Sequence, residues 1–286
     1  MSTRTIVFVG ATSGIGRHAA QRLATAGHRL VLIGRDPQRV HDLRAALPNA
    51  TVIAADVATK SGIDTAAVQI AESVDRVDTL VNNAGVMLQR RTVTAEGIEQ
   101  NLAVHHLAPY SMTSALLPLL RRGGGRVVNV NSEGHRSALL RSDPIDIDFD
   151  DLGSAHDYHV FVAYSRSKLA GLLFSYELQR RHPELEVVAV HPGMIRSDLV
   201  RGFSGLRLAA VRAASLVLSM PTARGADPIV HLATEPEVRR GAYYNRFAPQ
   251  TSSPASRDLG TARRLWEITE QLRGTFSPAD PPGGRS

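Results

Sequence analysis

Six short runs rich in β-branched residues alternate with longer segments of helical pattern. The runs are Thr5–Val9, Arg29–Ile33, Thr51–Ala54, Thr79–Val81, Arg126–Val130 and Leu185–Val190. The helical segments between them are Ile15–Ala26, Pro37–Leu47, Gly62–Val74, Ala95–Leu120 and Val160–Arg181. Strands that are separated by helices predict a parallel sheet, and near-continuous apolar strands predict that both of its faces are covered. We therefore expect an α/β fold with a doubly wound parallel sheet.

Two long connections interrupt this alternation. Residues 133–159 hold six aspartates and predict an irregular insertion, and residues 193–220 predict a mixed loop and helix. Such connections are often functional lids, although they can also be surface insertions without a direct role in function. With 286 residues, the chain is long enough for one large domain. We predict a single domain over 1–276, with a late helix at Ala255–Arg273, and a disordered Pro/Gly-rich tail over 277–286.

Composition limits the classes of partner. The formal net charge is +6, but the basic residues are scattered as singles and pairs, which argues against a nucleic-acid surface. The chain has no cysteine, so disulfides and thiolate chemistry are excluded. We find no secretory signal and no apolar run near the roughly 20 residues of a membrane span. We expect a cytoplasmic protein that acts on a small molecule, without a nucleic-acid or membrane partner.

The first run leads directly into a glycine-rich turn, and a helical segment follows at once. Glycines permit a tight turn and a close approach of the backbone, while the helix N-terminus offers free N–H groups to a pyrophosphate. An ordinary strand–turn–helix connection can carry the same pattern, but its place after the first strand favours a Rossmann-type dinucleotide site. The cofactor-binding candidates in this turn are Gly10, Thr12, Ser13, Gly14, Ile15 and Gly16.

The ends of the next strands supply further cofactor candidates. Arg35 and Asp36 follow the second strand, where an acidic residue binds the ribose 2′-OH and an arginine accommodates a 2′-phosphate. Because Arg35 comes first, the sequence favours NADP(H), with NAD(H) as the alternative; a surface turn would explain the pair without any ligand. The residues after the third and fourth strands are also of types that form ordinary turns, so they too could be present without a ligand. The candidates at these strand ends are Arg35, Asp56, Val57, Asn83, Ala84 and Gly85.

Tyr164 and Lys168 lie four residues apart in the last helical segment and therefore share one helix face. A phenol with a pKa of about 10 is a poor acid or base near neutrality, and a nearby ammonium lowers that pKa. A chance pair on a solvated helix would show the same spacing. Lys60 and Lys168 are the only lysines of this arginine-rich chain, which supports a specific need for lysine at position 168.

With the glycine turn, Asn82-Asn83-Ala84-Gly85, Tyr164/Lys168 and His191-Pro192-Gly193 in order, the chain resembles the short-chain dehydrogenase/reductase family over about residues 4–273. The retinol-dehydrogenase-like members are most similar. They share a longer stretch between serine and tyrosine, with an Asp-rich segment like Asp148–Leu152, and a Y-x-x-S-K-L-A pattern like Tyr164–Ala170.

The resemblance implies the roles of individual residues. Tyr164 exchanges a proton with the substrate oxygen, Lys168 lowers the pKa of that tyrosine and binds the nicotinamide ribose, and Ser132 orients the carbonyl. The segment after His191 covers the nicotinamide, with Ser197 where relatives usually have threonine. These positions add the cofactor-binding candidates Tyr164, Lys168, Pro192, Gly193, Ile195 and Ser197. The histidines form no metal-ligand motif, so we expect no metal.

The resemblance breaks at one position of the long helical segment. Relatives carry an asparagine there, in a V-N-H-L pattern, which holds a water in the proton relay to the lysine. This chain reads Ala103-Val104-His105-His106-Leu107, so His105, and not Asn101 one turn earlier, occupies the asparagine position. Either His105 also holds a water and reduction proceeds normally, or the relay is altered.

We therefore expect an NADP(H)-dependent oxidoreductase that reduces a carbonyl or oxidises a primary or secondary alcohol. The catalytic candidates are Ser132, Tyr164, Lys168 and His105. Apolar side chains near the site predict a fairly large, apolar substrate, unless they pack a lid onto the body: Met87, Leu88, Leu139, Leu140, Met194, Leu199 and Phe203. One alternative, motivated by His105, is a redox-neutral isomerisation, cyclisation or elimination. Another is a dinucleotide sensor, against which the intact Ser-Tyr-Lys set argues. A homodimer is an expectation from the family alone.

Overall fold

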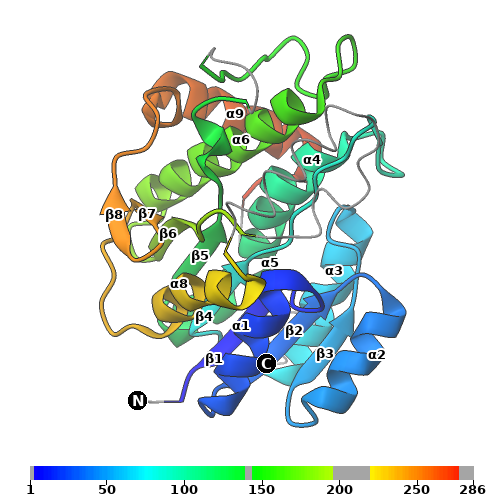
Figure 1. Ribbon diagram of the computed structural model, residues 1–286, viewed down its shortest axis with the longest axis vertical. Coiled ribbons are helices and arrows are strands. Elements are labelled where there is room, and N and C mark those ends of the chain that lie inside the picture. Colours follow the sequence, from blue (N-terminus) through cyan, green and yellow to red (C-terminus); the bar gives the residue numbers. More distant parts are fainter. Residues whose placement is uncertain (1–2, 139–143, 196–219, 277–286) are drawn as a thin grey trace, which may run out of the picture.

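Eight strands form one sheet in the computed structural model, which describes residues 3–138, 144–195 and 220–276 (Figure 1). Their order is β3-β2-β1-β4-β5-β6-β7-β8, and every neighbouring pair is parallel except β7–β8. The order changes direction between β1 and β4, which is where open α/β sheets bind ligands. The strands are β1 Thr5–Val9, β2 Arg29–Gly34, β3 Thr51–Ala54, β4 Thr79–Asn82, β5 Arg126–Val130, β6 Glu186–His191, β7 Ala242–Asn245 and β8 Ala248–Gln250.

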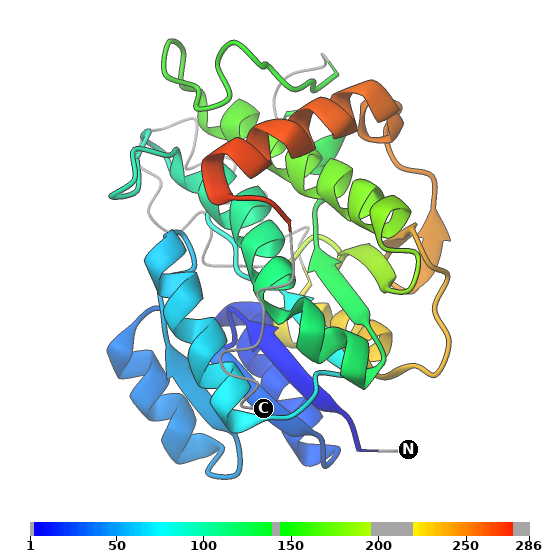
Figure 2. The same ribbon diagram turned by 180° about the vertical axis from the view of Figure 1, so that it is seen from behind.

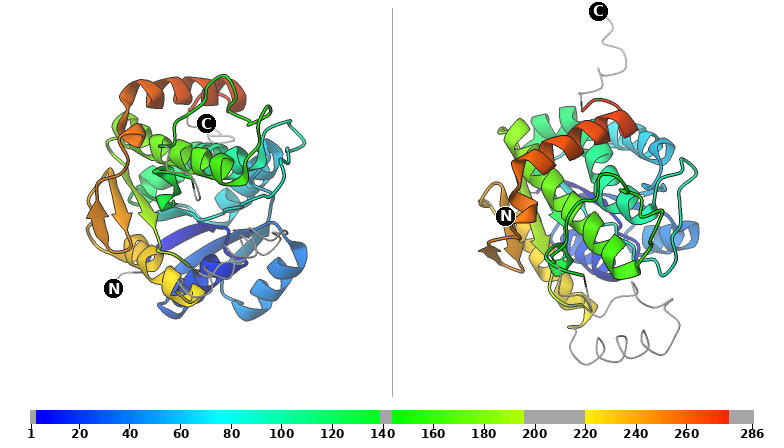
Figure 3. Two further views of the ribbon diagram at one scale, coloured as in Figure 1. Left: turned by 45° about the horizontal axis from the view of Figure 1, so that its top comes forward. Right: turned by 90° about the horizontal axis from the view of Figure 1, so that it is seen from above.

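Helices cover both faces of the sheet (Figure 3). Apolar side chains of α3, α5 and α6 pack on one face, and those of α1, α2 and α8 pack on the other. The fold is therefore the single-domain, Rossmann-type doubly wound sheet that the alternating pattern predicts. The helices are α1 Gly14–Thr25, α2 Pro37–Ala46, α3 Lys60–Ser73, α4 Gln100–Leu102, η1 Ala103–Leu107, α5 Ala108–Gly123, η2 Glu133–His135, α6 Val160–Arg181, α8 Thr222–Thr234, η4 Ala255–Arg257 and α9 Leu259–Arg273.

The six predicted strands are confirmed to within one residue at each end. The described residues form four further elements that the sequence did not predict: η2, α8, β7 and β8. The long predicted helix over Ala95–Leu120 begins only at Gln100, because the Glu99 side chain caps it by accepting hydrogen bonds from the next N–H groups. Within it, η1 is one turn of π-helix, a geometry often found at functional sites.

The late helix α9 lies across the outer side of α6 (Figure 2). The ring of Trp266 stacks on Phe174 of α6, with 6.0 Å between ring centroids, and also meets the edge of Tyr110 on α5. Asp258 starts α9 by accepting a hydrogen bond from the Thr261 N–H. The predicted helix over Ala255–Arg273 is therefore confirmed, with a break at Asp258.

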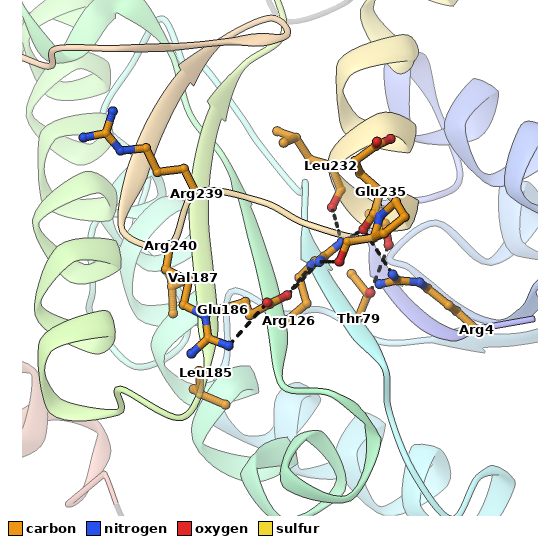
Figure 4. Close-up of polar contacts among 12 residues, drawn as sticks. Arg4, Thr79, Arg126, Leu185, Glu186, Val187, Leu232, Glu235, Arg239 and Arg240 are labelled. Carbon is orange, nitrogen blue, oxygen red and sulfur yellow. Dashed lines mark hydrogen bonds and ion pairs between the residues drawn. The ribbon is translucent and has the colours of Figure 1, made fainter. Parts of the chain in front are cut away.

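A buried arginine fixes α8 to the amino end of the sheet (Figure 4). The side chain of Arg126 is 2% exposed, and its guanidinium binds one carboxylate oxygen of Glu186 at 2.6 and 2.9 Å. The same group donates to the carbonyl oxygens of Leu232, Glu235 and Pro236, at and beyond the end of α8. A cation at a helix C-terminus satisfies carbonyls that the helix leaves free. Arg126 therefore fixes one end of α8, whose other end lies beside the glycine turn.

Two aspartates of the 133–159 insertion, Asp148 and Asp151, cap turns. Asp148 accepts hydrogen bonds from the N–H groups of Asp150 and Asp151, and Asp151 accepts from those of Ala155 and His156. Leu139 and Leu140 lie outside the described residues. No helix in the described ranges is both long enough and apolar enough to cross a membrane.

Candidate active site

The glycine turn between β1 and α1 forms a tight cradle. Gly10 has φ +84°, and a Cβ on it would lie 2.7 Å from the backbone of Ala84 after β4. A Cβ on Gly16 would overlap the carbonyl oxygen of Gly10, to which the Asn83 side chain donates a hydrogen bond of 2.9 Å. The structure thus brings together the predicted residues of the first turn and of the Asn83–Gly85 segment, and glycine is sterically required at both positions.

The N-terminus of α1 is left without a side-chain cap. Ser13 is its N-cap residue, but its side chain makes no capping hydrogen bond. By contrast, Asp36 and Thr59 cap α2 and α3 with their side chains. The first N–H groups of α1 and its positive dipole end can therefore bind an anionic group. Together with the cradle that a Cβ would fill, this geometry fits the pyrophosphate of a dinucleotide.

Arg35 and Asp36 follow β2, and only the Asp36 side chain has protein partners among the described residues. The carboxylate of Asp36 accepts the Arg39 N–H at 3.0 Å at the start of α2, and the Arg39 guanidinium lies 3.9 Å from it. Arg35 is exposed, and its side chain makes no ion pair within the described part of the chain. The arginine is therefore the freer group beside the expected adenosine ribose.

The loop after β3 is closely packed and held by hydrogen bonds. Asp56 Oδ1 accepts the Ala58 N–H at 3.1 Å, and Val57 is buried in the core beside α3. From the far end of the chain, Arg273 donates to the Ala58 carbonyl and pairs with Glu96. The predicted pair Asp56 and Val57 therefore lies at the carboxyl end of β3, on a loop that the last helix supports.

Tyr164 and Ser132 meet at the carboxyl edge of the sheet. Ser132 follows β5, and its Oγ accepts the Gly134 N–H at 3.1 Å. Burial raises the pKa of Tyr164 above its usual value, and the nearby Ser132 hydroxyl offsets part of this increase. The Gly134 N–H occupies one lone pair of the Ser132 oxygen and leaves the hydroxyl proton free. Ser132 can therefore donate this proton to the phenol oxygen of Tyr164 or to a substrate oxygen.

Lys168 is buried one turn after Tyr164. Its Nζ lies 5.7 Å from the centroid of the Tyr164 ring and donates to the Val130 carbonyl at 3.2 Å. Asn131 Nδ2 donates to the Lys168 carbonyl at 3.1 Å and so fixes β5 to α6. Burial lowers the pKa of Lys168 to about 7. Lys168 is among the catalytic candidates predicted from the sequence, whereas no sequence pattern indicated a role for Asn131.

His105 is buried, and both of its ring nitrogens have protein partners. The Val86 N–H donates to Nε2 at 3.0 Å, and Nδ1 lies 2.8 Å from Ser167 Oγ. A backbone N–H can only donate, so the single ring proton is on Nδ1, and Ser167 in turn donates to the Tyr164 carbonyl at 2.7 Å. Burial, and then the charge of Lys168, hold the pKa of His105 well below its usual value.

His105 therefore connects the loop after β4 to the helix of Tyr164, and its ring has no nitrogen left to hold a water. Its backbone is also confined, because a Cβ on Gly171 would lie 2.6 Å from the His105 carbonyl oxygen. Sequence reasoning missed Ser167 and Gly171, although the serine of Y-x-x-S-K was visible. Asn101 binds Glu99 and Tyr158 with its side chain and lies away from this chain of hydrogen bonds.

The segment after β6 reaches back to the glycine turn. Met220 donates its N–H to the Met194 carbonyl at 2.9 Å, and Ile195 pairs with Met220 in a parallel bridge. A Cβ on Gly225 of α8 would lie 2.7 Å from Ile195 Cδ1 and 3.2 Å from Ile15 Cγ1. Pro192 is buried, Gly193 has φ +102°, and Met194 is 59% exposed. Ser197, Leu199 and Phe203 lie outside the described residues.

Comparisons with known proteins agree with this geometry. Residues 4–140 match the family model described as short chain dehydrogenase. A Streptomyces sp. (strain C5) protein named as a daunorubicin C-13 ketoreductase, DnrU, is 35% identical over 280 residues, which cover 95% of this chain and 93% of that protein. Human retinol dehydrogenase 12 is 35% identical over 283 residues, covering 95% and 86%. The solved structure of an uncharacterised Mycobacterium paratuberculosis protein aligns with a TM-score of 0.76 at 28% identity, covering 97% and 96%.

Proposed function

The chain belongs to the short-chain dehydrogenase family, and we propose that it is an NADP(H)-dependent oxidoreductase acting through Ser132, Tyr164 and Lys168. Its reaction is the reduction of a carbonyl, or the oxidation of a primary or secondary alcohol, in a fairly large, apolar small molecule. The observation that carries this proposal is the placement of Ser132, Tyr164 and Lys168 together beside the glycine cradle. Ser132 and Tyr164 both pack against Gly134, and Lys168 Nζ lies 5.7 Å from the centroid of the Tyr164 ring.

In reduction, Ser132 orients the substrate oxygen with its free hydroxyl proton, and Tyr164 donates its own proton to that oxygen. When bound, the nicotinamide supplies or accepts the hydride. The ammonium of Lys168 then stabilises the phenolate that Tyr164 becomes, because the buried Nζ lies 5.7 Å from the centroid of the Tyr164 ring. The cradle and the uncapped N-terminus of α1 are the features that would bind the pyrophosphate.

The pH dependence should report Lys168. Since burial lowers its pKa to about 7, the ammonium is present below that pH and lost above it. We expect kcat for reduction to fall as pH rises through about 7. Lys168→Arg keeps its charge, so the falling limb of its profile should move to higher pH, whatever its maximal rate. The measurement is kcat against pH for both proteins. A limb that stays near pH 7 in Lys168→Arg would assign it to another group.

Arg35 supports the preference for NADP(H), because the neighbouring Asp36 carboxylate is engaged at the start of α2. We expect Arg35→Ala to weaken NADPH binding by about 10- to 100-fold, the range for one charge-assisted phosphate contact. NADH binding should change less than about two-fold, since NADH lacks the 2′-phosphate. Arg76→Ala removes another exposed charge at the opposite end of the sheet and serves as the control. Equal losses for both cofactors would reject the assignment of Arg35.

The geometry of His105 does not favour the redox-neutral alternative. Both ring nitrogens bind protein groups, so His105 adds no acid or base to the site. Met194, a large apolar side chain exposed beside the site, supports an apolar substrate, whereas Met87 packs partly against the body. A cytoplasmic location remains part of the proposal, and a homodimer remains a prediction from the family.

A further inference from the structure

The turn η2 contacts both side chains of the proposed proton-transfer pair. The Gly134 N–H donates to Ser132 Oγ at 3.1 Å. A Cβ on Gly134 would lie 3.3 Å from Tyr164 Cε1 and 3.4 Å from Ser132 Oγ, so the turn packs directly against both groups. A displacement of this turn would therefore change the position of Ser132 relative to Tyr164.

His135, the last residue of η2, fixes this turn to a segment 118 positions later in the chain. Its side chain is fully buried. The Ser253 N–H donates to Nε2 at 3.1 Å, and Nδ1 lies 2.7 Å from the Ser132 carbonyl oxygen. Because the backbone N–H can only donate, the ring proton is on Nδ1 and is donated to Ser132. The Ser253 hydroxyl also donates to the His135 carbonyl at 3.3 Å.

A second connection supports the other side of the turn. The Tyr243 hydroxyl on β7 donates to Glu133 Oε1 at 2.6 Å, and the Arg136 guanidinium binds Glu133 Oε2 at 2.6 Å. Arg136 also donates to the Thr251 carbonyl at 2.6 Å. The edge of the His135 ring meets Tyr243, with 4.8 Å between ring centroids. The turn is thus held from β7 and from the segment just after β8.

We propose that His135 is a positioning residue, which holds the Ser132 hydroxyl opposite Tyr164 by tying η2 to the Ser253 backbone, with Tyr243 as the second support. The inference rests on the proposed function, in which Ser132 contacts the substrate oxygen. His135 itself lies behind Ser132 and acts only through it. Groups that act through one another give non-additive losses of rate, and small displacements at a reacting centre cost large factors in rate.

The test uses three variants of the full chain. His135→Asn retains an amide donor for the Ser132 carbonyl but is too short to reach Ser253, and we expect kcat to fall about 10-fold. KM and the NADPH dissociation constant should change less than about two-fold. His135→Gln places an amide oxygen near the position of Nε2 and should recover kcat to within about three-fold of wild type. Tyr243→Phe removes only the hydroxyl that binds Glu133 and should lower kcat about three-fold. This variant tests the same support of η2 in the case that His135→Asn does not fold.

Thr269→Val is the matched control. It removes the Oγ1 that lies 2.7 Å from Nε2 of another buried histidine, His106, on the α9 side. Thr269→Val should lower the Tm by about as much as the His135 variants do, while its kcat stays within about two-fold of the wild-type value. A merely structural role for His135 predicts that its variants behave like this control.

A double-mutant cycle with Ser132→Ala decides between the two roles. In the Ser132→Ala background, His135→Asn should leave the residual rate unchanged within about two-fold. Wild-type kcat in folded His135→Asn, or an equal loss in both backgrounds, would overturn the inference alone. Full activity of Ser132→Ala would overturn the role of serine in the proposed function, and the inference with it.

Discussion

Tyr164→Phe should lower kcat by about three orders of magnitude, within the range that one general acid contributes. The substitution removes only the phenol hydroxyl, so the packing of the ring, including its edge contact with His105, can remain. The cradle at Gly10 and Gly16 is untouched, and the NADPH dissociation constant should therefore stay within about two-fold. Steady-state kinetics and a fluorescence titration with NADPH measure the two quantities separately.

Tyr110→Phe is the matched control for this experiment. Its hydroxyl is also removed from a hydrogen bond, at 2.9 Å to the Gly274 carbonyl, but on α5 beneath α9. We expect its kcat to stay within about two-fold of wild type. Turnover at the wild-type rate in Tyr164→Phe would exclude Tyr164 as the proton donor, whatever its place in the site.

Arg126→Ala should reduce the free energy of unfolding by about 3–5 kcal/mol, the usual cost of breaking a buried ion pair from one side. The change leaves Glu186 without its closest cation and removes a donor from three carbonyl groups at and beyond the end of α8, one of which, that of Glu235, also accepts from Arg4 (Figure 4). Urea denaturation, followed by circular dichroism, measures the difference.

Arg240→Ala removes the second arginine that pairs with Glu186. Its side chain is 53% exposed and lies 3.4 Å from the carboxylate, so its loss should cost less than about 1 kcal/mol. Equal destabilisation by the two substitutions would show that burial of Arg126 carries no special energetic weight.

The central sheet could be predicted from the sequence because its strands are buried on both faces and are therefore apolar almost throughout. The run Ile6–Val9, for example, has no polar residue. The edge elements lack this signal. β8 contains Pro249 and is exposed. β7 has only four residues, and its extended conformation depends on pairing with β6. α8 carries Pro228 in its interior, a residue that disfavours helix formation, and the structure accommodates it as a buried residue.

The parts of the site set by short-range spacing could also be predicted. The glycine turn and the pair Tyr164/Lys168 each lie within one local element. The contacts that hold them are long-range. Nothing local indicates that His105 would bind Val86 and Ser167, or that His135 would meet Ser253 across most of the chain. Among the described residues, no three or more His, Asp or Glu side chains form a cluster that could hold a metal ion.

Transfer of deuterium from 4-²H-labelled NADPH tests the proposed function most directly. The purified protein is incubated with a panel of apolar ketones and aldehydes, and the products are analysed by mass spectrometry, with Tyr164→Phe as the control. The proposal predicts deuterium from one face of the cofactor on the new carbinol carbon, in amounts equal to the NADPH consumed, and almost none with Tyr164→Phe. Products that carry no deuterium, formed while NADPH is unchanged, would contradict a reductase and identify a redox-neutral enzyme on the same fold.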